Sequence, residues 1–511
     1  MKTLIKNARI LTMDENFSEY ESGDILIEGT QISQIAENIK IPDDKNNIRV
    51  MDARGKLVMP GLVNGHFHSP GNFMKGALDS LPLEIFMLYE VPPLSDSPPD
   101  ARHIYVRTML SSLEMIKNGT TAVHDDAYYV PYPTPETIDG LMQSYADIGM
   151  RAVATIDQPN VVEYEKYPYL YDLLPDALRS QMENAPIMPE SDLLTCYNHL
   201  LEKWNGTYQG RLRAGLSVSA PQRVTVSYFE ALCELSQKFD LPFDIHILET
   251  KLQRVLGQEK YGKSLVQYVD DLGFLIEQVM VIHAIWVNDE DIARMAESGC
   301  SIAHNPLCNL RLGSGVMQFR KILDSGINVC LGSDEACSDD SVNMWLVGKV
   351  AGLIHNITDP DYHKWPRPKE ILRAMTHGGA KAMRNQDKAG ILAPGYEADL
   401  IILNLDSLSF TPLNDIYKQL IYNELGSSVE TTMIAGDIVY DDGKVLTVDE
   451  ESIKGEAREI MKSYRVAMDQ IDDAAKKLEP YYREMYLKAA HQEVKMNRWV
   501  SYDSNKSDSK S

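Results

Sequence analysis

Two histidines separated by one residue, His66 and His68, close an apolar run in the segment GLVNGHFH. In a β-strand, residues i and i+2 lie on the same face, so both imidazoles can point the same way. Neutral imidazoles are common ligands of zinc and other divalent metals. The H-x-H pattern also arises by chance, so a metal site requires partners elsewhere in the chain.

Further metal-ligating side chains close other apolar runs: His246, His283, His304 and Asp334. Three imidazoles and one carboxylate form a donor set for a catalytic divalent metal with a position open for water. The predicted ligands are His66, His68, His246 and Asp334.

Glu249 follows His246 by three residues. If the strand ends at His246 and the chain curls, its carboxyl group returns over the site and can shuttle a proton. The alternative is a surface glutamate that opens the next helix.

Eight apolar runs carry these residues, and most are followed by a helix-like segment. The runs are GLVNGHFH (61–68), TTAVHDD (120–126), RAVATID (151–157), LRAGLSVSAP (212–221), LPFDIHILET (241–250), VMVIHAIW (279–286), CSIAHNP (300–306) and INVCLGSD (327–334). Eightfold strand–helix alternation predicts an α/β fold of the (β/α)8, or TIM, barrel type. The candidate ligands then share the carboxyl-terminal face of the barrel, where such enzymes place their catalytic groups.

The two ends of the chain read differently, as short alternating strands punctuated by Gly and Asp. We expect residues 1–58 and 391–447 to form one small β-sandwich from both termini, beside a metal-dependent barrel at 59–390. Residues 448–499 are charged and helix-like, interrupted by Pro480, and predict a helical extension. The polar residues 500–511 predict a disordered tail.

The bulk composition restricts the classes of partner. The formal net charge of -24 argues against nucleic acid, which requires basic surface. No apolar run is long enough to predict a transmembrane helix, and the N-terminus lacks the apolar core of a signal peptide. The six cysteines form no C-x-x-C pair and read as reduced, buried thiols, which indicates a cytoplasmic protein.

The chain resembles the amidohydrolase superfamily, in the aminohydrolase branch that includes cytosine and guanine deaminases, S-adenosylhomocysteine/methylthioadenosine deaminases and s-triazine hydrolases. The motifs that carry the resemblance are PGLVNGHFH, HILET, VIHAIWVNDEDIARMAESG, IAHNPLCNLRLGSGV, LGSDEACSDDSVNMW, AMTHGGAKAM and GYEADLIIL. They occur in the family's order and cover residues from about 1 to 447.

The resemblance implies one divalent metal ion, zinc first with iron or manganese as alternatives, on the four predicted ligands. It implies that His283 hydrogen-bonds the metal water or the developing oxyanion, that Asp334 accepts the water proton, and that Glu249 protonates the ring nitrogen. Metal hydroxide would attack an electron-poor ring carbon, and the tetrahedral intermediate would expel ammonia or an amine.

Four residues are predicted to contact the substrate: Gln222, Trp286, His304 and Asn309. Trp286 reads equally well as core. His124, Asp125 and Asp126 end the second strand, and we expect them to serve packing more than substrate contact.

The chain departs from the S-adenosylhomocysteine deaminases at three positions. Phe86 stands where those enzymes have a Trp, Ser95 where they have a Glu that binds ribose, and Gln222 where they have a His, with Glu90 nearby but not aligned. A site built to hydrogen-bond particular groups discriminates against ligands that lack them. These departures predict a substrate other than an adenosine-type nucleoside.

The leading hypothesis is a metal-dependent hydrolytic deaminase of a small N-heteroaromatic ring, of purine, pterin, pyrimidine or s-triazine type. One alternative is an amidohydrolase that cleaves a cyclic amide or a halogen–carbon bond. The other is a catalytically silent barrel used for binding. We further expect a homo-oligomer, a dimer or larger.

Overall fold

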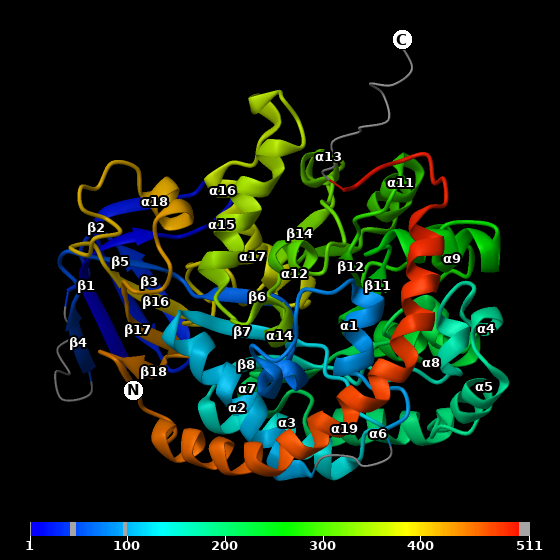
Figure 1. The fold of residues 1–511 in the computed structure, drawn as a ribbon. Coiled ribbons are helices and arrows are strands. Elements are labelled where there is room, and N and C mark those ends of the chain that lie inside the picture. Colours follow the sequence, from blue (N-terminus) through cyan, green and yellow to red (C-terminus); the bar gives the residue numbers. More distant parts are fainter. Residues whose placement is uncertain (1, 41–47, 96–99, 500–511) are drawn as a thin grey trace.

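The computed structural model describes residues 2–40, 48–95 and 100–499. The predicted tail at 500–511 lies outside the described residues. The small β domain built from both termini is confirmed, and its strands hydrogen-bond as one nine-stranded sheet, at the left of Figure 1. Its strands are β1 (Lys2–Leu11), β2 (Glu19–Glu28), β3 (Gln31–Ala36), β4 (Ile48–Asp52), β5 (Lys56–Pro60), β16 (Leu400–Asn404), β17 (Val429–Ile434), β18 (Asp437–Asp441) and β19 (Lys444–Val445).

This sheet joins the two ends of the chain through β5 and β16, which pair antiparallel with Val58 opposite Ile402. Alternate apolar side chains of both strands enter one core, in which Val58, Leu400 and Met433 are buried. Strand β5 leads directly into the first barrel strand, so the sheet fixes where that strand begins.

All eight predicted barrel strands are present, and they pair in parallel. They are β6 (Leu62–His68), β7 (Thr120–Asp125), β8 (Arg151–Ala154), β9 (Leu212–Ala214) continued by β10 (Leu216–Ser217), β11 (Phe243–Ile247), β12 (Val279–His283), β13 (Ser301–His304), and β14 (Asn328–Leu331) continued by β15 (Asp334–Glu335). Their burial is nearly complete on both faces, as expected for parallel strands covered by helices.

The barrel's hydrogen-bond ladder divides into two five-stranded parallel sheets, ordered β10-β11-β12-β13-β14 and β15-β6-β7-β8-β9. The fourth predicted strand is divided at Gly215 and the eighth between Leu331 and Asp334. At the first division, the Gly215 N–H donates to Ala154, whereas the next residue, Leu216, donates to Pro242 on the other side. The fourth strand therefore belongs to both sheets in turn.

Helices follow the strands and cover them. The longer ones are α1 (Leu83–Glu90), α2 (Ala101–Lys117), α3 (Pro135–Ile148), α5 (Asp176–Glu183), α6 (Glu190–Lys203), α8 (Val226–Phe239), α9 (Lys251–Tyr261), α10 (Leu265–Asp271), α11 (Asp289–Ser298), α15 (Met344–Ile354), α16 (Pro368–Ala374) and α18 (Ile416–Tyr422). Shorter ones are α4 (Leu170–Leu173), α7 (Thr207–Gly210), α12 (Pro306–Arg311), α13 (Phe319–Asp324), α14 (Ala336–Asp339) and α17 (His377–Ala382).

Helix α11 shows how the sequence sets these boundaries. Asn288 and Asp291 form a reciprocal capping box at its start, and Gly299 ends it in the left-handed conformation.

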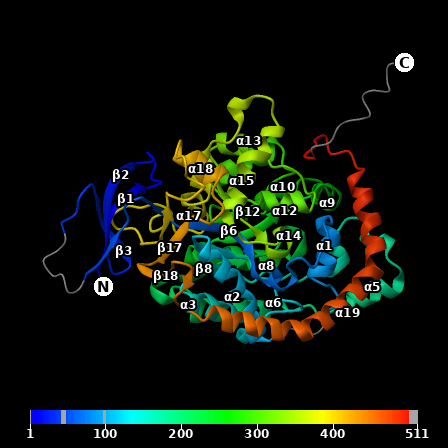
Figure 2. The same cartoon turned by 60° about the vertical axis from the view of Figure 1, so that its left-hand side comes forward.

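The C-terminal extension is one long helix, α19 (Glu450–Ala490), which in both views runs along the lower edge of the molecule and then rises along the right side (Figures 1 and 2). It packs against α1, α2, α4 and α9. We expected Pro480 to interrupt the helix, and instead the helix continues through it. Leu478 and Tyr482, on either side, are buried in the same apolar cluster, and this packing offsets the hydrogen bond that proline cannot make.

Among the described residues, no helix combines the length and apolar character needed to cross a membrane. All six cysteines are free and buried, as predicted.

Candidate active site

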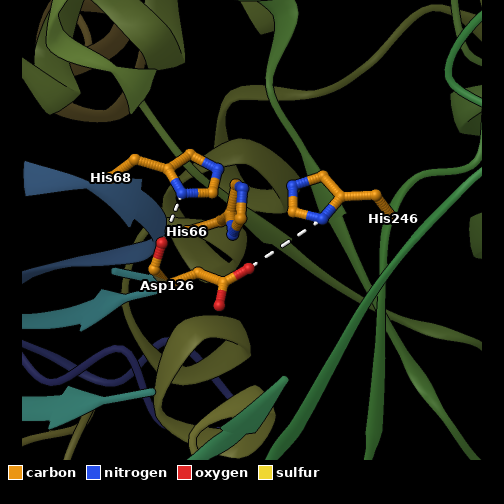
Figure 3. A group of neighbouring side chains, drawn as sticks. All are labelled: His66, His68, Asp126 and His246. Atoms are coloured by element: carbon orange, nitrogen blue, oxygen red, sulfur yellow. Dashed lines mark hydrogen bonds and ion pairs between the residues drawn. The ribbon is translucent and has the colours of Figure 1, made fainter. Parts of the chain in front are cut away.

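Three of the predicted imidazoles converge at the carboxyl ends of two strands. His66 and His68 close β6, and His246 lies near the end of β11 (Figure 3). The centroid of the His66 ring lies 4.6 Å from that of His68 and 5.0 Å from that of His246, and the rings of His68 and His246 are 5.3 Å apart. The strand-end positions predicted from the sequence therefore bring these side chains together.

Hydrogen bonds to backbone carbonyls orient two of the three rings. The Nδ1–H of His68 donates to the carbonyl of Asp126, and that of His246 donates to the carbonyl of Ser219 at 2.8 Å. With one proton on Nδ1, Nε2 is the nitrogen of each ring that can ligate a metal ion. Both ring nitrogens of His66 are buried without a hydrogen-bond partner. A buried imidazole left unpaired in this way fits a metal ligand.

The pKa values of these rings differ with their surroundings. Burial and the neighbouring imidazoles lower the pKa of His66 and His246 well below the ordinary value, so both rings are neutral. Burial also opposes the charged form of His68, but the carboxylates of Glu335 and Asp334 raise its pKa to about 10. The carboxylates beside His68 therefore favour a positive charge at that ring.

A carboxylate approaches the three imidazoles from each of two sides. Asp126, just after β7, joins His66, His68 and His246 in a group that could hold a metal ion, with one ligand atom of each within 4.8 Å of the others. Figure 3 shows its side chain beneath the rings. Its Oδ2 lies 3.9 Å from Nδ1 of His246, the nitrogen that already donates to Ser219.

Asp334, on β15, lies on the other side of the rings. Its Oδ1 is 3.7 Å from Nε2 of His66 and 3.5 Å from Nε2 of His68. Its Oδ2 accepts a hydrogen bond from Asn305 Nδ2 at 3.1 Å. Asp334 thus faces the two lone pairs that the strand end of β6 presents.

His283 and Glu249 lie beside Asp334. Nε2 of His283 is 3.4 Å from Oε2 of Glu249 and 3.7 Å from Oδ2 of Asp334. Asn309 Nδ2 donates to Nδ1 of His283 at 2.9 Å, which assigns the ring proton to Nε2, on the side of the carboxylates. Burial lowers the pKa of His283 to about 4, so its neutral ring can donate a hydrogen bond.

Glu249 is buried, and its Oε1 accepts a hydrogen bond from Ser314 Oγ at 2.8 Å. Burial, reinforced by the carboxylate of Asp334, raises the pKa of Glu249 to about 8. The group is therefore protonated at neutral pH. The alternative reading of Glu249 as a surface residue is wrong.

Four non-glycine residues with positive φ surround the site: Ser219 (61°), Leu248 (56°), His283 (74°) and Asp334 (59°). Such backbone conformations are disfavoured for side chains with a Cβ and persist where surrounding contacts impose them. The carbonyl of Ser219 accepts from the backbone of His246, and that of Leu248 accepts from Ile285 and Trp286. The strained backbone at the ends of four strands thus directs the functional side chains towards the mouth of the barrel.

A cavity opens onto the site. Its walls include five predicted residues, His68, His246, Glu249, His283 and Asp334. The four predicted substrate contacts are not among its lining residues. Trp286 is buried and donates to the carbonyl of Ser314, His304 pairs with His355 at 3.1 Å, Asn309 holds His283, and Gln222 is buried in a short 3-10 turn (Pro221–Arg223).

The same walls hold polar residues that the sequence interpretation did not assign: Glu90, Asp157, Arg223 and Glu335. Asp157 ends a predicted strand and Glu335 directly follows one. The search for polar residues at strand ends that identified Asp334 could therefore also have identified them. Glu90 ends helix α1, away from any predicted strand end, so that search would not have found it.

The sequence matches the profile described as "Amidohydrolase family" over residues 57–439. It is 30% identical to a 5'-deoxyadenosine deaminase of Methanosarcina acetivorans over 455 residues, 89% of this chain and 96% of that protein. It is 32% identical to a 5-methylthioadenosine/S-adenosylhomocysteine deaminase of Thermococcus kodakarensis over 441 residues, 86% of this chain and 94% of that protein.

Solved structures agree on the fold. A zinc complex of atrazine chlorohydrolase from Arthrobacter aurescens TC1 superposes with a TM-score of 0.81 at 24% identity, covering 89% of this chain and 99% of that one. A zinc-bound adenosine deaminase from Xanthomonas campestris superposes with a TM-score of 0.78 at 22% identity, covering 91% and 98%. With the family profile matching most of its length, the chain belongs to the amidohydrolase family.

Proposed function

We propose that the protein is a metal-dependent deaminase of adenosine-type purine nucleosides, which replaces the amino group of the ring by oxygen and releases ammonia. The observation that carries the proposal is a buried carboxyl group, Glu249, whose Oε2 lies 3.4 Å from Nε2 of His283, the nitrogen that also faces Asp334, at the edge of a three-histidine cluster. Full-length relatives named as deaminases of 5'-deoxyadenosine and of methylthioadenosine and S-adenosylhomocysteine support the choice of substrate.

The departures at Phe86, Ser95 and Gln222 had predicted a substrate other than a nucleoside, and the names of these relatives weigh against that expectation. In the fold, Phe86 and Glu90 line the cavity, whereas Ser95 and Gln222 are not among its lining residues. The carboxylates of Glu90 and Glu335 on that wall supply acceptors for substrate hydroxyl groups. An acceptor is therefore present although it is not at the aligned position.

The metal proposed is a single divalent ion, zinc before iron or manganese, held by His66, His68, His246 and Asp334. The similar structures of atrazine chlorohydrolase and of the adenosine deaminase contain bound zinc. A divalent ion bound there would supply Lewis acidity, which lowers the pKa of water towards neutrality. Asp126 then serves as the group behind the rings, since it meets His246 on the Nδ1 side.

The residues around the ion divide the proton transfers between them. Asp334 accepts a proton, because its two oxygens face His66 and His283 and no lysine or arginine among the described residues pairs with it. Glu249 donates a proton to a ring nitrogen, which makes the adjacent carbon more electrophilic. His283 donates its Nε2–H to the oxygen that develops negative charge there.

Ammonia release is the direct test. The metal-loaded protein is incubated with 5'-deoxyadenosine, methylthioadenosine and S-adenosylhomocysteine, and in parallel with cytosine, guanine and an aminated s-triazine. We expect ammonia to be released faster from the nucleosides than from cytosine, guanine or the s-triazine. Turnover confined to the free bases or the triazine would overturn the proposed substrate.

Metal analysis separates the two aspartates. Asp334→Asn should remove most of the bound metal, whereas Asp126→Asn, which preserves the backbone carbonyl that orients His68, should retain it. The reverse result would make Asp126 the ligand and Asp334 the supporting group.

A further inference from the structure

An arginine in α2 is buried without a counter-ion bond. Arg107 is 7% exposed, and its Nε and Nη2 have no hydrogen-bond partner among the residues that the structure describes. The carboxylate that raises its pKa, Asp125, is already occupied: its Oδ1 accepts from the Ser69 N–H at 2.9 Å and its Oδ2 from the Tyr145 hydroxyl at 2.7 Å. A buried, unpaired guanidinium is costly, so the residue fits a ligand that supplies the missing acceptor.

Arg107 faces a cavity of about 480 Å³ between α2, the segment 92–95 and the middle of α19. It is the one lysine or arginine among the described residues that line this cavity. His103, Ser463, Tyr464 and Gln470 add neutral donors around it. Burial and the charge of Arg107 lower the pKa of His103 to about 4, so that ring is uncharged. The cavity thus offers one buried cation surrounded by neutral hydrogen-bonding groups.

The cavity adjoins the candidate active site. Tyr128 and Glu90 line both spaces. The ring of Tyr128 lies 5.9 Å from that of His68 on its other side, and its hydroxyl is close enough to Arg107 to affect its pKa. Glu90 is the single carboxylate among the described residues that line the 480 Å³ cavity, and its Oε1 accepts from Cys337 Sγ at 2.7 Å. A substrate that occupied both spaces would have its ring at the histidines and its far end at the guanidinium.

We propose that Arg107 binds an anionic group, a carboxylate or a phosphate, carried by the part of the substrate that lies farthest from the reacting ring. The inference rests on the proposed function and narrows it to nucleosides with an acidic substituent. The guanidinium would donate two parallel hydrogen bonds from Nε and Nη2, the geometry that matches both anions.

Equilibrium binding tests this without turnover. In the metal-loaded Glu249→Gln protein, dissociation constants are measured for neutral 5'-deoxyadenosine, for adenosine 5'-monophosphate as the phosphate probe and for S-adenosylhomocysteine as the carboxylate probe. Adding Arg107→Met should weaken binding of at least one anionic probe about 10- to 100-fold relative to 5'-deoxyadenosine, the range for charge-assisted hydrogen bonds. An unchanged ratio for both probes would overturn the proposal.

Two further variants guard the interpretation. Arg107→Lys keeps the charge but loses the forked geometry, so it should weaken the same probe by less, and it stands in if the methionine variant does not fold. Arg102→Met makes the same replacement on the same helix at a side chain that is 54% exposed, and it should leave the ratio as it is.

A test with inorganic phosphate distinguishes binding of a free anion at Arg107 from binding of an anionic group of the substrate. If phosphate raises the melting temperature of the wild type but not of Arg107→Met, while the ratio of dissociation constants stays the same, Arg107 serves a separate anion and the substrate role is overturned. Failure of the proposed function appears differently, as absence of ammonia release from every nucleoside by the otherwise unaltered enzyme.

Discussion

At the scale of single residues, the site is defined by which nitrogen of each ring is already bonded. Backbone carbonyls accept hydrogen bonds from the Nδ1–H groups of His68 and His246, and the Asn309 amide donates one to Nδ1 of His283. Two rings are thereby prepared as ligands and the third as a donor. The role of each histidine, as ligand or as hydrogen-bond donor, is therefore set by the group that its Nδ1 contacts.

Replacing Glu249 by Gln keeps the shape of the side chain and the bond from Ser314 but removes the transferable proton. We expect kcat for ammonia release to fall about 10²- to 10⁴-fold, the usual contribution of general acid catalysis. Metal content and melting temperature should remain close to wild type. Glu84→Gln is the matched control, because Glu84 is also buried with a pKa raised to about 7, yet it does not line the cavity.

The pH profile follows from the same group. Burial raises the pKa of Glu249 from 4.5 to about 8, so the protonated form persists through neutral pH and disappears above it. A reaction that requires this proton should lose kcat/KM about tenfold per pH unit beyond pH 8. The Glu249→Gln variant should lack this decline; its persistence in that variant would assign the basic limb to another group.

The metal-binding histidines were predictable because a strand end fixes both position and direction. His66, His68, His246 and Glu249 meet as expected. Asp126 was predicted to serve packing, and only the fold shows that it joins the three imidazoles in one cluster and lies 3.9 Å from His246. The unpaired state of Arg107 also could not be predicted, since it depends on the bonds that occupy Asp125.

At the scale of elements, all eight strands and the helix caps were predictable from apolar runs and flanking Gly, Asn and Asp residues. The interruptions of the fourth and eighth strands were not, because they depend on how neighbouring strands twist against each other. Helix α19 continues through Pro480 for a similar reason, since its packing on α1, α2, α4 and α9 outweighs a local preference that the sequence expresses clearly.

Gly332 lies in the break of the eighth strand and packs closely against His66 and Asn305. A Cβ there would lie 2.6 Å from the carbonyl oxygen of His66 and 2.5 Å from Oδ1 of Asn305, whose amide bonds Asp334. We expect Gly332→Ala to lower the free energy of unfolding by about 1–3 kcal/mol through overpacking. It should also reduce metal content, because His66 is a proposed ligand and Asn305 holds another, Asp334.

The matched control is Gly455→Ala, in α19, where a Cβ would meet no heavy atom within 4 Å. This change should raise stability by up to about 1 kcal/mol through helix propensity. Chemical denaturation and metal analysis measure both variants. Full metal content in the Gly332→Ala protein would contradict the role given to the strand break.

At the scale of the whole molecule, the end of the described chain returns to the active site. After α19, Arg498 donates from Nε to the carbonyl of Ile285 at 3.0 Å and from Nη2 to that of Val287 at 2.7 Å. Trp499 donates to Gly313, and its ring packs 5.1 Å from that of Trp286. This C-terminal segment therefore connects the loops after β12 and α12.

Those loops hold the proposed proton donor. Trp286 donates to the carbonyl of Ser314 at 2.8 Å, and the Ser314 hydroxyl donates to Glu249. We expect Arg498→Ala to loosen this chain of contacts and to lower kcat about tenfold, since small displacements of a catalytic group are costly, while metal content remains that of the wild type. Arg465→Ala, an exposed arginine of α19, removes the same charge without these contacts and should retain activity. Equal kcat values for the two variants would show that the C-terminal segment stabilises the barrel without positioning Glu249.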